Sequence, residues 1–129
     1  MTNETNSRIH AFTDDALGDL DAVGVAAAIA AGTISAREAA EAAIARAEAV
    51  NPALNAIQVP DFDRALKAAE TPRPGPLSGV PSFVKDNTAY EGLTTDQGSL
   101  AVKSRVATAN EPFTDQFVSA GFTVLGKST

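Results

Sequence analysis

The stretch covering residues 75–87 constrains the fold of this chain more than any other part of the sequence. It opens with proline and glycine, which interrupt regular structure, and it becomes polar again at Asp86 and Asn87. The short apolar run between them, Gly79 to Lys85, has the length and boundaries of a β-strand. Pro81 restricts its own position to the start of that strand or to a sheet edge. The chain must therefore build a sheet in which one strand ends on a lysine.

Lys85 is the candidate catalytic residue, and the pattern allows two interpretations of it. Burial disfavours the charged form of a lysine, and a desolvated lysine can act as a general base. Alternatively, Lys85 marks the exit of the strand to solvent, followed by a turn at Asp86 and Asn87. On spacing alone the second interpretation is the stronger.

The rest of the chain alternates between helix and strand patterns. Ser35-Ala36-Arg37-Glu38 is a capping box and marks a helix start. We expect that helix to stop before Asn51-Pro52. We also expect the helix over Ala22 to Ala31, apolar on all sides, to be buried by more than one neighbour. The expected helices are 22–31, 35–50, 61–70 and 112–121, and the expected strands are 55–59, 79–85 and 122–126.

This order predicts an α/β fold with a mixed, partly parallel sheet flanked by helices, and with helices preceding the first strand. The length of 129 residues suits one domain. We expect residues 1–15 to form a flexible tail and residues 16–129 to belong to a single domain. Residues 87–105 are expected to form a loop, with turns at Gly92 and Gly98.

Composition excludes several classes of function. The chain has no cysteine and a single histidine, so we expect no disulfide, metal site or cofactor. Its net charge is −6 without a basic stripe, which argues against nucleic acid and anionic membranes as partners. The first dozen residues lack the apolar segment of a secretion signal, so a cytoplasmic location is expected.

The segment Gly121 to Ser128 fits the phosphate-binding pattern G-x-x-x-x-G-K-[ST]. That loop has to follow a strand and open a helix. Here a predicted helix precedes the segment, and its four middle residues are typical of a strand. We therefore reject a nucleotide site and predict a glycine that stops a helix, followed by a buried strand.

Two runs of residues match a known pattern: Gly75-Pro76-Leu77-x-Gly79-Val80-Pro81-x-x-Val84-Lys85-Asp86-Asn87 and Gly92-Leu93-x-Thr95-x-x-Gly98-Ser99. They resemble the beginning of the amidase signature family. The flanking segments 35–38, 51–56 and 124–128 are similar to the same family. The resemblance covers about residues 20–129 and implies the N-terminal part of an amidase-type fold.

The resemblance implies that a carboxamide is cleaved by a Ser–cis-Ser–Lys triad. The family lysine matches Lys85, which would take a proton from a nucleophilic serine through a bridging serine. Asp86, Asn87, Gly98 and Ser99 would shape the neighbouring site. The implied substrate is a small-molecule amide, and no cofactor is implied.

One departure from the family concerns the Gly/Ser-rich signature that carries both serines and the oxyanion hole. In the family it follows the strand that matches residues 124–128, and this sequence does not contain it. Neither Ser99 nor Ser128 stands in a matching motif. We therefore expect a truncated amidase that is inactive alone and whose exposed strand edges favour self-association or a homodimer.

Two other functions stay open. One is the A subunit of the tRNA-dependent glutamine amidotransferase, which shares the Lys-Asp-Asn segment, although residues 94–99 fit the general amidases better. The other is a non-catalytic fragment that acts through contacts with other proteins.

Overall fold

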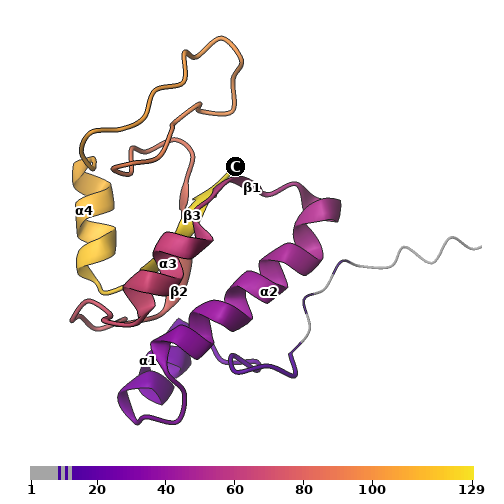
Figure 1. Cartoon of the computed structure of the whole chain (residues 1–129), viewed down its shortest axis with the longest axis vertical. Helices are drawn as coiled ribbons and strands as arrows, with labels where there is room; N and C mark the ends of the chain where they lie inside the picture. The colour runs from indigo at the N-terminus through magenta and orange to yellow at the C-terminus, as the bar shows by residue number, and fades with distance from the viewer. Residues whose placement is uncertain (1–8, 10, 12) are drawn as a thin grey trace, which may run out of the picture.

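A three-stranded mixed sheet with helices on both faces forms the centre of the molecule (Figure 1). The computed structural model describes residues 9, 11 and 13–129. The elements in chain order are α1 (Ala22–Ala30), α2 (Ala36–Leu54), β1 (Ile57–Pro60), α3 (Phe62–Ala69), β2 (Pro81–Lys85), α4 (Pro112–Ser119) and β3 (Thr123–Ser128).

The last strand, β3, is the central one. The strand order is β1-β3-β2, with β2 parallel and β1 antiparallel to β3. Residues 123–127 are all buried, as expected of a strand covered on both faces. The mixed sheet predicted from the alternation of elements is confirmed.

Helices cover the two faces of this sheet with different side chains. On one face, Leu125 packs in a cluster with Ala40 of α2 and Ala65 of α3. On the other face, Val118 of α4 packs against β2 and β3. Figure 1 shows α4 standing on the opposite side of the strands from α2 and α3. The alanines of α2 let the helices approach closely.

Helix α2 begins as predicted and ends later than predicted. The Ser35 hydroxyl accepts from the amide of Glu38, and the Glu38 carboxylate accepts from the amide of Ser35, which completes the capping box. The expected stop before Pro52 was wrong. Pro52 removes a single helical hydrogen bond close to the end of the helix, and the chain turns only at Asn55, which has a φ of 49°.

The expectation that α1 is buried on all sides was also wrong. Val25 is its only buried residue, and Val23 is 71% exposed. The helix packs on α2 through one side, where Val25 meets Ala39 and Ala42. Alanine and glycine make up much of α1, so its outer side exposes little apolar area per residue.

The strands follow the predictions with shifted ends. β1 covers residues 57–60 in place of 55–59, and Pro60 is tolerated because β1 lies at the sheet edge. β3 continues to Ser128, two residues past the predicted end. The predicted tail, residues 1–15, lies largely outside the described residues, and at its end Asp15 already bonds to Arg46 of α2 (2.7 Å).

The glycines of the phosphate-binding pattern have structural roles. Gly126 lies in β3 with a φ of 142°, and a Cβ there would overlap the carbonyl oxygen of Val59 in β1. Gly121 makes the turn after α4 with a φ of 104°. The segment is therefore a helix stop and a strand, as predicted. Within the described residues, no helix is both long and apolar enough to cross a bilayer.

Candidate functional site

The carboxyl ends of the parallel strands β2 and β3 lie at the same edge of the sheet. Lys85 is the last residue of β2 and pairs in register with Ser128 of β3. Asp86 and Asn87 follow directly on the chain. Lys127 stands one position before Ser128, opposite Val84. Lys85 is therefore the last residue of its strand, and Lys127 is the last but one of the neighbouring strand.

Lys85 is exposed, as in the interpretation in which it marks the exit of the strand to solvent. Its Nζ donates a 3.4 Å hydrogen bond to the main-chain oxygen of Thr129, and within the described part of the chain it forms no ion pair. The reason is the place of its strand, because β2 is an edge strand of the three-stranded sheet. Its role as a base stays a prediction.

The buried lysine is Lys127. Its side chain is 0% exposed, and its Nζ lies 3.0 Å from Oδ1 of Asp86. The same ammonium donates to the carbonyl oxygen of Thr94 (2.9 Å) and to the hydroxyl of Thr95. All three N–H groups of the ammonium thus have an acceptor, which offsets the cost of burying its charge.

Asp86, also buried, connects three segments of the chain. Its amide donates to the carbonyl of Ser128 (2.8 Å), which continues the pairing of β2 with β3. Its carboxylate accepts from the amide of Asp96 (3.2 Å), and its carbonyl accepts from the amide of Gln97 (3.1 Å). The loop after β2 is therefore folded back onto the end of the strand that carries Lys85.

The other predicted site residues lie on this loop or beside it. Asn87 is exposed, and Gly98 has a φ of 67° in a turn that a side chain would strain. The Ser99 amide donates to the carbonyl of Asp96, and its Oγ accepts from the amide of Ala101 (3.2 Å). The Ser99 hydroxyl thus stabilises its own turn, and no hydrogen bond among the described residues joins it to Lys85.

Gly98 and Ser99 line a cleft of about 340 Å³ together with Gln58 of β1 and Asp96. The Gln58 amide donates to the Asp96 carboxylate at 3.3 Å. Exposed apolar side chains, Leu100 and Val102, form its other wall. This cleft is where the structure brings two predicted site residues to an open surface.

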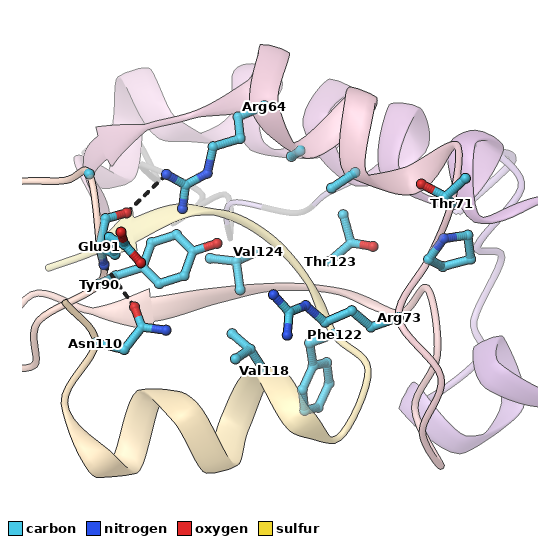
Figure 2. A pocket seen from close by; sticks show the side chains of 14 residues that line it. Arg64, Thr71, Arg73, Tyr90, Glu91, Asn110, Val118, Phe122, Thr123 and Val124 are labelled. Atoms are coloured by element: carbon cyan, nitrogen blue, oxygen red, sulfur yellow. Dashed lines mark hydrogen bonds between the residues drawn. The ribbon is translucent and has the colours of Figure 1, made fainter. Parts of the chain in front are cut away.

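A larger cleft, of about 480 Å³, lies between α3 and α4 (Figure 2). Arg64 donates to the carbonyl of Glu91 (2.9 Å), and its guanidinium stacks on the ring of Tyr90 at 4.4 Å. Asn110 accepts from the amide of Glu91 (2.8 Å). None of the predicted site residues lines this cleft, so its size does not make it the candidate site.

The sequence interpretation missed Lys127 as part of the candidate site. It treated the residue as the end of a rejected phosphate loop, outside the last strand. A usable signal was present, since a lone lysine closing an apolar run of central-strand character has to find a buried partner. Asp86, which follows a strand that also ends on a lysine, was the available carboxylate.

Comparison with known proteins gives one family. The family model described as Amidase matches residues 38–129. AmiC of Mycobacterium tuberculosis strain H37Rv is 48% identical over 124 residues, which cover 95% of this chain and 26% of AmiC. The acylamidase of Rhodococcus erythropolis is 40% identical over 125 residues, covering 91% of this chain and 26% of that protein. The chain spans about a quarter of the length of these relatives.

Comparison with solved structures shows the same fold. The 6-aminohexanoate cyclic dimer hydrolase complexed with substrate superposes with a TM-score of 0.78 at 34% identity, over 85% of this chain and 23% of that one. The peptide amidase of Stenotrophomonas maltophilia superposes with a TM-score of 0.75 at 26% identity, over 88% of this chain and 25% of that one.

Proposed function

Because the chain belongs to the amidase family, we propose that it forms the part of an amidase that supplies the general base, and that the base is Lys85. The reaction is hydrolysis of a carboxamide to a carboxylate and ammonia or an amine. The two serines of the proposed Ser–cis-Ser–Lys triad are not among these 129 residues. Lys85 is the one triad member that the sequence holds.

One observation carries this proposal: Lys85 ends β2 inside residues 38–129, which the Amidase family model matches. Asp86 forms its ion pair with Lys127, which leaves the Lys85 amine without a carboxylate partner among the described residues. Asp86 therefore does not hold the Lys85 side chain, which is exposed at the end of β2.

In the proposed steps the Lys85 amine first takes up a proton and then gives it back. An unprotonated Lys85 takes the hydroxyl proton of the nucleophilic serine through the bridging serine, and the serine oxygen bonds to the amide carbon. The carbon–nitrogen bond then breaks, and the leaving nitrogen takes up the proton. Water, deprotonated by the same route, then bonds to the carbonyl carbon of the serine ester. The ester bond breaks, the acid leaves, and the serine oxygen takes the proton back.

A general amidase is favoured over a component of an amidotransferase. The acylamidase of R. erythropolis and an indoleacetamide hydrolase of Bradyrhizobium diazoefficiens are 40% and 41% identical to this chain. The A subunit of the glutamyl-tRNA(Gln) amidotransferase from Alkalilimnicola ehrlichii is 36% identical. We propose a small amide as substrate, without a tRNA partner.

A chimera tests the proposal. The segment of the R. erythropolis acylamidase that aligns with this chain is replaced by these 129 residues, and hydrolysis of an amide accepted by the parent acylamidase is measured. We expect activity in the chimera, and a loss of kcat of roughly 100- to 10,000-fold on Lys85→Met, as for removal of a general base. Glutamine is assayed in parallel as the substrate of the amidotransferase alternative.

Lys67→Met is the matched control, since Lys67 is an exposed lysine of α3. The control chimera should keep its activity and its thermal unfolding midpoint. A Lys85→Met chimera that is folded and as active as the control would refute the role of Lys85. The 129-residue chain alone should release no ammonia from simple amides, and turnover that Lys85→Met abolishes would refute that expectation.

A further inference from the structure

We infer that Lys127 is a positioning residue of the proposed amidase site, which holds the loop Thr94–Ser99 against the strand end that carries Lys85. This inference rests on the proposed function for its link to catalysis. Lys127 touches none of the proposed reacting groups. It acts through Asp86 and through the loop.

The ammonium of Lys127 joins the end of β2 to the start of the loop. One acceptor is the Asp86 carboxylate, next to Lys85, and the other two belong to Thr94 and Thr95. An ammonium with three directed N–H groups in a buried site fixes all three acceptors at once. A simple counter-ion for Asp86 would need only the first of these contacts.

A β-bridge between Thr94 and Val106 holds the start of the loop, and beyond it the loop has little packing of its own. Residues 97–100 are exposed, and Leu100 is fully accessible to solvent. Outside the cluster, the bond from the exposed Gln58 of β1 to Asp96 is long, at 3.3 Å. The cluster therefore sets where Gly98 and Ser99 stand relative to Lys85.

Amide hydrogen exchange in the full 129-residue chain tests the inference without an activity assay. Lys127→Met should accelerate exchange at the amides of Asp96 and Gln97 by about tenfold or more relative to the core amide of Thr123, which bonds to Val80. Thr95→Val removes one contact without stranding a charge, and it should accelerate the same two amides by a few-fold. Lys67→Met should change neither.

The double variant Asp86→Asn with Lys127→Met separates positioning from charge neutralisation. If Lys127 only neutralises Asp86, the double variant regains the protection that Lys127→Met loses, and the inference is wrong. If Lys127 positions the loop, exchange at Gln97 stays fast. Equal acceleration at Thr123 and at the loop amides would mean a general structural role and would also overturn the inference.

The acylamidase chimera supplies the catalytic readout. Thr95→Val should lower kcat while the thermal unfolding midpoint stays close to that of the Lys67→Met control. Unchanged kcat with accelerated loop exchange would limit Lys127 to the loop and overturn its link to the site. If Lys127→Met does not fold, Thr95→Val decides both readouts. If the chimera is inactive, the proposed function fails, and the exchange experiment still decides the effect on the loop.

Discussion

At the scale of single residues, Lys85 and Lys127 lie on neighbouring strands and differ in burial, because β3 is the central strand and β2 an edge strand. Lys127 is the last residue but one of the central strand and is surrounded by acceptors, whereas Lys85 ends an edge strand and is exposed. Burial of a lysine is tolerated only where its charge and its N–H groups are satisfied. Lys127 meets this requirement. The Asp86 carboxylate that pairs with it forms no ion pair with Lys85.

A second ion pair predicts how stability depends on pH. The Arg46 guanidinium hydrogen-bonded to Asp15 holds the pKa of that carboxyl below its usual range, and the pair raises the pKa of Arg46. The Asp15 contribution is therefore complete above the unfolded-state value, near pH 4, and is lost as the pH falls through the lower folded-state value. Asp15→Asn should destabilise the chain by about 1 kcal/mol at pH 7.

The measurement is urea unfolding as a function of pH. Below about pH 4 the difference between wild type and Asp15→Asn should shrink, because the wild-type carboxyl becomes protonated as well. Asp19→Asn is the control, since Asp19 is exposed in the same turn and makes no ion pair among the described residues. A difference between wild type and Asp15→Asn that stays constant down to about pH 2 would contradict the assignment.

At the scale of elements, local signals in the sequence predicted starts better than ends. The capping box at Ser35 and the proline at the first position of α4 are decided by neighbouring residues, and both were confirmed. The end of α2 depends on a turn at Asn55, and the end of β3 on a buried partner for Lys127. Spacing along the chain identifies neither the turn nor the distant partner.

The candidate site shows the same division. The position of Lys85 at the end of β2 followed from the sequence, and the parallel neighbour was expected from the alternation of elements. The exposure of Lys85 agrees with the interpretation favoured by spacing alone, in which the residue marks the exit of the strand to solvent. By contrast, the link from Asp86 to Lys127 joins residues 41 positions apart, 127 − 86, and arises only from the sheet register.

The pairing of β1 with β3 gives a prediction at this scale. A Cβ at Gly126 would overlap the Val59 carbonyl and would also strain the backbone, whose φ is 142°. Gly126→Ala should lower the free energy of unfolding by about 3 kcal/mol, because β1 must move away from the central strand. The measurement is urea unfolding followed by circular dichroism.

Gly32→Ala is the matched control, because Gly32 has a φ of +73° with open space around it. It should cost about 1 kcal/mol from backbone strain alone. If the two variants lose the same stability, the close approach of β1 to Gly126 is not what requires the glycine.

At the scale of the whole molecule, the chain is a three-stranded sheet covered by helices, with the candidate site at the carboxyl end of β2. It belongs to the amidase family and spans about a quarter of the length of its curated relatives. Three features lie together in these residues: the end of β2 at Lys85, the loop that Asp86 bonds to, and the cleft lined by Ser99. Self-association through the exposed β2 edge stays a prediction.

The central claim is that an amine at position 85 acts as the base, and chemical rescue tests it most directly. Lys85→Cys in the acylamidase chimera should be inactive, and alkylation with 2-bromoethylamine, which rebuilds a lysine-like amine on the sulfur, should restore a measurable part of kcat. Alkylation with iodoacetamide should restore none, and a Lys67→Cys chimera should be active before and after either treatment. A Lys85→Cys chimera that is active untreated, or that both reagents leave inactive while it remains folded, would contradict the account.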